Sequence, residues 1–479
     1  MHNTTLSLAL LSALILSGCA IGPDYVRPEM ASPQKFLHQD VNQTAKGTID
    51  TQWWKSFNDE SLNRAVEEAL VSNYDLLASR ASVDALLGKF DQAKSYLYPQ
   101  INANGSLDRK GVDNASSGGN QLREGVTSTY AGSLSLASYE IDLFGKVRRA
   151  NESARAALLS SEYASQTLKI TTASSVAASY IKLASLQGQI DLAKENVTLN
   201  NEIVQLNEMK YKHGVIAETT LLQSLSEVES AKATLSQLEA TKISEEATFN
   251  LLLGRNPSPV STASLNAITL PEVPAALPSN ILNKRPDIAS AEQNLIAANA
   301  MIGVARAAYF PSIKLTGMLG VQSLELNDFV SNPARIWEIG PSISVPIFSA
   351  GRIAGEIKTA EADRNQSLAT YKKTIVSAFN DTDNAIGQTA KAKEQITYQR
   401  ARTDAIHKAL SQSKLRYQVG TITYSDMLLV QQQWLQASQQ FLIAKQNALI
   451  ATVSLYKALG GGWSDEQTPP LPDLLPSGR

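Results

Sequence analysis

The residue with the clearest chemistry is Cys19, the single cysteine of the chain. It follows an apolar run at 6–16 and then Ser17 and Gly18. An apolar core of this length is typical of a signal peptide, and small residues directly before a cysteine form a lipobox, in which the thiol accepts a diacylglycerol. We expect 1–18 to be a signal peptide and Cys19 to be lipidated, rather than a free cysteine behind an ordinary signal.

Other reactive residues are sparse and scattered. Asp381 and Asp383 lie in a polar run, 380–384, which is interpreted as a lumen or solvent face. No nucleophile elbow or phosphate loop is present. The histidines show no metal-ligand spacing; they are His2, His38, His213 and His407. We therefore expect neither an enzyme nor a bound cofactor or metal. With 43 basic and 45 acidic residues, the net charge of −2 gives no indication of nucleic-acid binding.

Two long segments, 146–213 and 351–418, dominate the organisation of the chain. Both are free of proline, so each can form one helix of roughly 100 Å at 1.5 Å per residue. Shorter helical patterns accompany each rod, and in each half two of them, stacked end to end, nearly match the rod in length. These shorter helices are expected at 75–97 and 218–253 in the first half, and at 287–309 and 423–459 in the second.

The two rods belong to an internal duplication. Tyr211 and Gly214 near the end of the first rod recur as Tyr417 and Gly420 near the end of the second. Each half should therefore build the same unit. The expected segments are a signal peptide at 1–18, a lipidated extended N-terminal arm at 19–59, a first repeat at 60–270, a second repeat at 271–460 and an irregular C-terminal tail at 461–479.

Each repeat also contains a predicted β-hairpin, at about 100–143 and about 311–349. After Pro99 the apolar period changes from 3.6 to 2, as in a strand with one apolar and one polar face. A change of phase in the returning strand predicts a bulge near Ala137. Strands of this length can cross a bilayer. Four strands cannot close a barrel, so several chains must share a closed sheet, unless the hairpins pack on a soluble body. No apolar stretch long enough for a transmembrane helix follows the signal peptide.

Several motifs together resemble one family, the TolC-like outer membrane factors, and within it the NodT-type lipoprotein branch. They cover essentially all of the mature chain, and no single one would suffice. They are the lipobox, the segment from Gly22 to Pro28, Trp53-Trp54 with Phe57, the segment from Tyr139 to Arg148, the Tyr-Pro and Phe-Pro strand entries, and the duplicated Tyr-x-x-Gly turns.

The resemblance implies an α+β membrane protein, in which a trimeric 12-stranded β-barrel with four strands per chain continues into a long periplasmic α-helical barrel. Such a homotrimer is the exit duct of a tripartite efflux pump for drugs or other small toxic compounds. Its partners would be a periplasmic adaptor protein, an inner-membrane RND-type transporter and outer-membrane lipid. It would be anchored in the outer membrane at Cys19, with a large periplasmic extension. A type I protein-secretion duct and a lipid-anchored periplasmic coiled-coil scaffold remain alternatives.

The resemblance also implies a gate at the periplasmic tip. By its position Asp426 matches a family gate aspartate, whereas Leu429 stands where members often carry a second aspartate. A mixed acidic and apolar seal is therefore expected. Glu218 offers a nearby carboxylate in the first repeat, and Tyr211 and Tyr417 are candidates for hydrogen bonds in the gate or for turn packing. Asp426 could equally cap the last helix, and the two roles are compatible.

The rods reverse direction at two turns that we expect to form the tips. Gly214-Val215 and Gly420-Thr421 occupy these turns, where glycine can adopt the positive φ of a tight reversal. In the family, adaptor hairpins dock near such turns. These four residues are therefore the expected adaptor-docking positions.

Overall fold

A computed structural model describes residues 20–30, 33, 35–38, 49–112, 125–273 and 283–463. The signal peptide, Cys19 and the tail after 463 lie outside the described residues. The chain divides into two compact units, and each unit takes segments from both repeats, so the units are not the two sequence repeats. Unit 1 is Met1–Glu29, Ser82–Ser161 and Ser290–Tyr371, and unit 2 is Met30–Ala81, Glu162–Ala289 and Lys372–Arg479.

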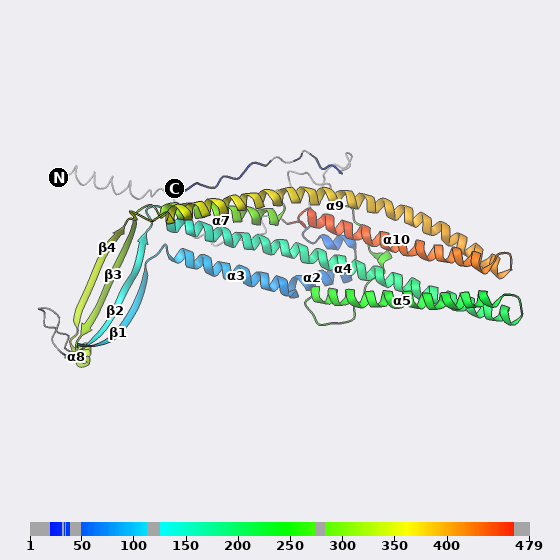
Figure 1. Ribbon diagram of the computed structural model, residues 1–479, viewed down its shortest axis with the longest axis horizontal. Helices are drawn as coiled ribbons and strands as arrows, with labels where there is room; N and C mark the ends of the chain where they lie inside the picture. Colours follow the sequence, from blue (N-terminus) through cyan, green and yellow to red (C-terminus); the bar gives the residue numbers. More distant parts are fainter. Residues whose placement is uncertain are drawn as a thin grey trace. The chain divides into compact units, whose positions relative to one another are not determined.

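The elements follow the duplicated pattern closely (Figure 1). The two rods are single helices, α4 and α9, of 67 residues each. A short helix that the sequence pattern did not indicate, α8, interrupts the second hairpin. In chain order the elements are η1 Trp53–Phe57, α2 Glu60–Ser72, α3 Tyr74–Ser95, β1 Gln100–Val112, β2 Gly125–Ile141, α4 Lys146–Lys212, α5 Glu218–Leu252, η2 Leu265–Ala267, α7 Pro286–Ala307, β3 Ser312–Ser323, α8 Leu326–Ser331, β4 Ala334–Ser344, α9 Arg352–Gln418 and α10 Tyr424–Ala458. Within the described segments, no helix is both long and apolar enough to cross a membrane.

The strands form one antiparallel sheet in unit 1, in the order β1-β2-β3-β4. The register between β2 and β3 shifts between Leu136 and Tyr139, so the predicted bulge is present. Each hairpin pairs its own strands, and β2 pairs with β3 to join the two repeats. Among the described residues, β1 and β4 each have a paired neighbour on one side only.

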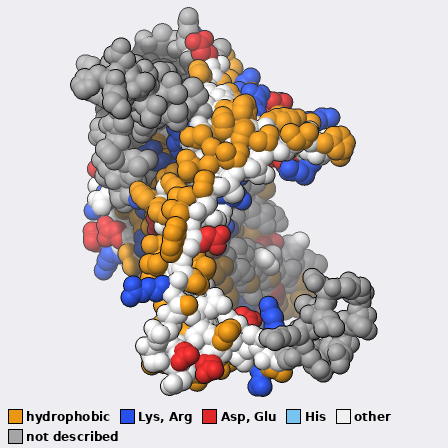
Figure 2. All heavy atoms as spheres, turned by 90° about the vertical axis from the view of Figure 1, so that its left-hand side faces the viewer, with side chains coloured by type: hydrophobic (Ala, Val, Ile, Leu, Met, Phe, Trp, Pro, Cys, Tyr) orange, Lys and Arg blue, Asp and Glu red, His pale blue; other side chains and the backbone are white. Residues whose placement is uncertain are grey.

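The sheet is strongly amphipathic. The register places Leu134 of β2 opposite Leu319 of β3, and Leu319 opposite Trp337 of β4, so these side chains share a face. Trp337 is 75% exposed although it is the largest apolar side chain of the sheet. Figure 2 shows hydrophobic side chains gathered in a band on the side of the molecule that carries the strands. Other exposed apolar residues on the same face are Ile101, Leu107, Ile339 and Ile343, while polar residues such as Asn102, Asn104, Ser135, Lys314, Thr316 and Glu338 alternate with them.

The start of the N-terminal arm is fixed to unit 1 by close backbone approaches. Gly22, with a φ of +113°, lies against Gly303 of α7, and neither position has room for a side chain. The amide of Asn299 donates to the carbonyl of Pro23 at 2.8 Å, and Arg149 of α4 pairs with Asp24. The arm therefore bridges α4 and α7, and it holds Ala20, the residue after the predicted lipidation site, at a fixed place.

The two tryptophans before the first helix belong to the hydrophobic core of unit 2. Trp53, Trp54 and Phe57 are buried in this core, where they act as packing anchors. Asp59 caps α2, because its Oδ1 accepts hydrogen bonds from the main-chain amides of Ser61 and Leu62. Its second oxygen accepts the hydroxyl of Tyr180 at 2.9 Å, which ties α2 to α4.

Equivalent joints in the two repeats link the end of one helix to the start of another. In the first, the side-chain amide of Asn73, just before α3, donates to the carbonyl of Leu252 at the end of α5, at 2.8 Å. In the second, Arg285, just before α7, donates to the carbonyl of Ala458 at the end of α10, at 3.2 Å. Terminal carbonyls of a helix lack partners within the helix, so each joint satisfies one of them. The expected end-to-end pairs are thus joined at their ends in unit 2.

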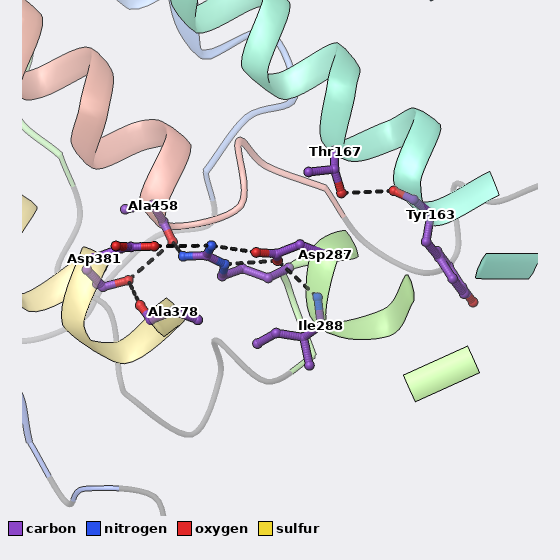
Figure 3. A network of polar contacts seen from close by, with 9 residues as sticks. Tyr163, Thr167, Asp287, Ile288, Ala378, Asp381 and Ala458 are labelled. Atoms are coloured by element: carbon purple, nitrogen blue, oxygen red, sulfur yellow. Dashed lines mark hydrogen bonds and ion pairs between the residues drawn. The ribbon is translucent and has the colours of Figure 1, made fainter. Parts of the chain in front are cut away.

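The second joint carries charge that the first lacks. The guanidinium of Arg285 binds both oxygens of Asp287 at 3.0 and 2.6 Å, and it lies 3.7 Å from Asp381 of α9. Figure 3 shows Asp287, Asp381 and Ala458 converging at this joint from three helices. Asp381 is therefore an ion-pair partner, and the interpretation of 380–384 as a lumen or solvent face is wrong for Thr382, which is fully buried.

Candidate functional site: the helical tip

The candidate site is the end of unit 2 where α4 and α9 reverse into α5 and α10. Gly214 and Gly420 have φ of +70° and +76°, as expected for reversals that need glycine. The amides of Val215 and Thr421 donate to carbonyls five residues back at 2.8 and 2.9 Å, which closes each helix end. Val215 and Thr421 are exposed, so the expected docking positions lie on the surface of this unit.

The second tip is better capped than the first. Thr423 and Asp426 form a capping box, in which the Thr423 hydroxyl accepts the amide of Asp426 at 3.1 Å and the Asp426 carboxylate accepts the amide of Thr423 at 3.1 Å. In the first repeat Ala217 takes the capping position and makes no side-chain bond. Glu218 follows it, exposed in the first turn of α5.

Asp426 therefore has the capping role that the sequence suggested, and its role in the gate stays a prediction. It belongs to the cap of α10, and its carboxylate is fully exposed. The hydrogen bond from the Thr423 hydroxyl, 2.7 Å long, is the main reason that the pKa of Asp426 lies below its ordinary value. The side chain thus stays ionised at neutral pH. Leu429 follows one turn later in α10, and its apolar side chain is 56% exposed.

Tyr417 is the buried centre of the tip. Only 5% of it is exposed, and its ring packs near Tyr424 at 6.0 Å between centroids. Burial raises the pKa of Tyr417 and raises that of Tyr424 to about 12, so both hydroxyls stay protonated. The Tyr417 hydroxyl donates to Oδ1 of Asn207 on α4 at 2.7 Å, and the ammonium of Lys210 lies 4.0 Å from the ring centroid. Tyr211, the equivalent residue, is 41% exposed.

Behind Tyr417 lies a buried polar layer that the sequence did not reveal. The side-chain amide of Gln431 on α10 donates to Asn196 and Asn200 on α4, at 3.2 Å each. Some buried polar atoms of this region have no partner among the described residues, namely Nδ2 of Asn207, Oε1 of Gln431 and the hydroxyl of Tyr424. Unpaired buried polar atoms are costly, and these three atoms lie on α4 and α10. The spacing of Asn196, Asn200 and Asn207 along one helix face was the available signal.

The described residues contain no cluster of three or more His, Cys, Asp or Glu side chains arranged to hold a metal ion. The residues at the tip are instead hydrogen-bonding, aromatic and acidic groups at helix ends. Such groups can fix the conformation of a helix-to-helix turn, and the acidic ones can attract or repel charged solutes. They supply neither a nucleophile nor a metal centre.

The chain is similar to known proteins along nearly its whole length. The sequence model of the family described as "Outer membrane efflux protein" matches residues 65–255 and 277–461, one stretch in each half. The chain is 33% identical over 474 residues to "Probable efflux pump outer membrane protein TtgC" of Pseudomonas putida, covering 97% of each chain. It is 30% identical over 461 residues to "Probable outer membrane lipoprotein SilC" of Salmonella typhimurium, covering 95% of this chain and 98% of the relative.

A solved structure gives the same result for the fold. The crystal structure of the CmeC outer membrane channel of Campylobacter jejuni matches with a TM-score of 0.84 at 25% identity, covering 93% of this chain and 96% of the other. These findings confirm the predicted resemblance, the fold class, the outer-membrane location and the role as an exit duct. Because the family model matches both halves and a relative aligns along nearly the whole length, the chain belongs to the outer membrane efflux protein family.

Proposed function

We propose that three copies of this chain form the outer-membrane exit duct of a tripartite pump that passes drugs or other small toxic compounds to the exterior. The duct catalyses nothing, and it opens and closes at the helical tip. One observation carries the proposal: the four-stranded sheet has an exposed apolar face, a polar face and two strands, β1 and β4, with an open side.

This sheet is suited to lipid on one side and water on the other. Exposed Trp337 and Ile339 would be unfavourable in water but favourable in hydrocarbon. In lipid, however, each unpaired main-chain group of an edge strand costs several kcal/mol. Pairing β1 of one copy with β4 of the next removes both edges, and three copies close a ring of twelve strands. The polar face then lines a water-filled lumen.

The tip supplies the proposed gate. In the ring, three Asp426 carboxylates repel one another and attract cations, which biases the pore against anions. Leu429 adds an apolar side chain to this seal, and Glu218 and Tyr211 add exposed polar side chains from the first repeat. Tyr417, through Asn207, holds the closed arrangement of α9 against α4.

The proposed partners follow from the helical tip and from the N-terminal arm. Exposed Gly214, Val215, Gly420 and Thr421 form the surface where a periplasmic adaptor would dock and connect the duct to an inner-membrane RND-type transporter. In the N-terminal arm, lipidation of Cys19 would anchor the chain in the outer membrane. The docked arm supports this anchor, because Ala20 packs against Gly145 so closely that a side chain at residue 145 would overlap it.

The test is whether the sheet behaves as a lipid-facing surface of a trimer. Trp337→Lys places a charge on the apolar face, and the neighbouring Glu338→Lys places the same charge on the polar face. We expect Trp337→Lys to lose most of the heat-sensitive trimer from the outer-membrane fraction, because a charge on the lipid-facing side of a strand costs up to about 2–4 kcal/mol per copy. Glu338→Lys should keep it. Equal loss in both variants, or wild-type protein that fractionates as a soluble monomer, would contradict the proposal.

A further inference from the structure

The apolar face of the sheet carries two charged side chains within the four described strands, and both are arginines. The register places Arg109 of β1 on the same face as Leu107, and Arg335 of β4 on the same face as Trp337. Every other charged residue of these strands belongs to the polar face; these residues are Asp108, Lys110, Glu140, Lys314 and Glu338. The charge on the apolar face is therefore purely positive.

Both arginines lie at the same end of the sheet. β1 ends at Val112 and β4 begins at Ala334, so each arginine is close to a hairpin connection. At the opposite end of the sheet, β2 leads into α4 and β4 leads into α9 (Figure 1). In the proposed duct these helices extend into the periplasm, so Arg109 and Arg335 lie at the outer rim of the membrane.

The spacing along the two strands fits the thickness of a bilayer. The apolar face runs from Ile101 to Arg109 on β1, and from Ile343 back to Arg335 on β4. Each run rises roughly 27 Å at about 3.4 Å per residue, and the apolar band of outer-membrane barrels is about 25 Å tall. Tilt of the strands shortens this rise, and a long arginine side chain reaches outward to compensate. Each guanidinium is therefore expected at the depth of the outer lipid head groups.

Neither guanidinium is neutralised within the part of the chain that the structure describes. Arg109 and Arg335 are exposed, and they form no ion pair or hydrogen bond with another described residue. α8 carries two acidic residues, Glu325 and Asp328, but neither pairs with Arg335 among the described residues. A guanidinium presents several N–H donors in a planar fork that matches the oxygens of a phosphate group. At this depth the chemistry of both side chains is suited to phosphate.

An apolar surface adjoins Arg335 on the same face. The ring of Phe329 in α8 lies over Gly132 of β2, so close that a Cβ at residue 132 would be 3.4 Å from Cζ of Phe329. Gly132 pairs with Val321, and Val321 pairs with Arg335, so α8 covers the row of the sheet that ends in this arginine. The neighbouring apolar side chains with more than half of their surface exposed are Leu326, Val330 and Trp337. A phosphate-binding cation thus lies beside a surface for acyl chains.

We propose that Arg109 and Arg335 bind the phosphate groups of lipopolysaccharide, the anionic lipid of the outer leaflet, and that its acyl chains pack against α8 and Trp337. The inference rests on the proposed function, because it requires the apolar face to lie in the outer membrane. Arg109 is on β1 and Arg335 is on β4, the two strands that pair between copies in the proposed ring. The arginines therefore stand on the two sides of each junction, and a lipid with two phosphates can bind both copies and stabilise the trimer.

The test measures lipid binding to the purified trimer by native mass spectrometry. The double variant Arg109→Gln with Arg335→Gln removes both charges, and the control Lys110→Gln removes one charge from the polar face beside Arg109. We expect lipid A with both phosphates to bind the double variant at least about tenfold more weakly than wild type or the control, because hydrogen bonds between ionised groups are among the strongest in proteins.

Two further probes separate lipid from phosphate alone. Lipid A without phosphates should bind wild type no better than phosphorylated lipid A binds the double variant. Inorganic phosphate in excess should leave the bound lipid A in place, because the acyl chains contribute to binding. Displacement of the lipid by inorganic phosphate would show a general anion site and would overturn the proposal.

A second measurement follows the stability of the trimer. Phosphorylated lipid A should raise the temperature at which the wild-type trimer dissociates on a gel, and should raise it less in the double variant. Lysine at positions 109 and 335 keeps the charge but loses the fork. It should restore part of the binding and of the stabilisation, which also controls for misfolding of the glutamine variant.

The outcomes distinguish the two proposals. If wild type forms conducting trimers but the double variant binds phosphorylated lipid A as tightly as wild type, the inference fails and the proposed function stands. If the lysine pair binds no better than the glutamine pair, positive charge is not responsible, and the inference also fails alone. If wild type forms no membrane-inserted trimer, the proposed function fails and the inference fails with it.

Discussion

The hydroxyl of Tyr417 donates to Oδ1 of Asn207 at 2.7 Å, and this buried hydrogen bond joins the end of α9 to α4. The duplication does not preserve it, because Tyr211 is 41% exposed at the equivalent position. One repeat thus buries its tyrosine against Asn207, while the other presents its tyrosine to solvent. The two tips of the chain are therefore not equivalent.

Removing that hydroxyl should loosen the tip. Tyr417→Phe leaves the Asn207 side chain with no partner for either polar atom, since its Nδ2 is already unpaired among the described residues. We expect a loss of about 1–3 kcal/mol in the free energy of unfolding and more frequent opening in planar bilayers. Tyr211→Phe is the matched control and should change neither quantity. Equal effects of the two substitutions would show that Asn207 does not hold the tip.

Acid should remove the charge of the proposed acidic ring. The hydrogen bond from Thr423 lowers the pKa of Asp426 below its ordinary value of 3.8. The folded state therefore favours the carboxylate, so this contribution to stability is present above pH 3.8 and disappears as the pH falls through the lowered pKa. Cation selectivity should be constant from pH 7 to about 4 and fall below it.

The variant Asp426→Asn provides the reference for this titration. It keeps an oxygen that can accept in the capping box, but it carries no charge. Reversal potentials measured across a salt gradient should show weaker cation selectivity at pH 7 and no change on acidification. If wild type and Asp426→Asn respond to acid identically, another group determines the selectivity.

Two glycines with positive φ should respond very differently to alanine. Gly420 at the tip has open space around it, so Gly420→Ala costs only the left-handed backbone strain, about 1–2 kcal/mol. Gly460 lies against the carbonyl of Lys284, which a Cβ would overlap. Gly460→Ala should therefore cost clearly more in thermal or denaturant unfolding. Similar losses for both would mean that the α7–α10 joint can relax.

The charge at that joint can be tested by exchanging residues between repeats. Arg285→Asn introduces an asparagine, the residue type that the first joint has at position 73. This asparagine can still cap α10, but it cannot form ion pairs with Asp287 and Asp381. We expect a loss of about 1.5–3 kcal/mol in the free energy of unfolding, typical of hydrogen bonds to charged groups. Asn73→Gln is a size control in the first joint. An unchanged stability of Arg285→Asn would show that the cap alone is sufficient.

The sequence predicted the elements well for physical reasons. Proline-free runs ending at Gly214 and Gly420 define α4 and α9, since neither a breaker nor a cap interrupts them. The change of period after Pro99 located the hairpins, and the shift of phase located the bulge at Leu136. These signals are local in the sequence, so a single chain is enough to see them.

The hydrogen bonds between different helices could not be predicted in the same way. Asn207 and Thr382 lie among polar residues and would serve a solvated helix face equally well. Their roles come from Tyr417 and Ala458, which are distant along the chain. The register between helices determines which polar residues meet, and the sequence of α9 alone leaves that register open. The capping box was easier to foresee, because Thr423 and Asp426 are neighbours.

The central claim, that the chain forms a duct closed at its helical tip, is tested most directly by conductance. Purified wild type should form trimeric pores of low conductance in planar bilayers, and Tyr417→Phe should raise the fraction of time in the open state. Absence of any pore in both proteins would contradict the account. A pore already fully open in wild type would contradict the closed tip.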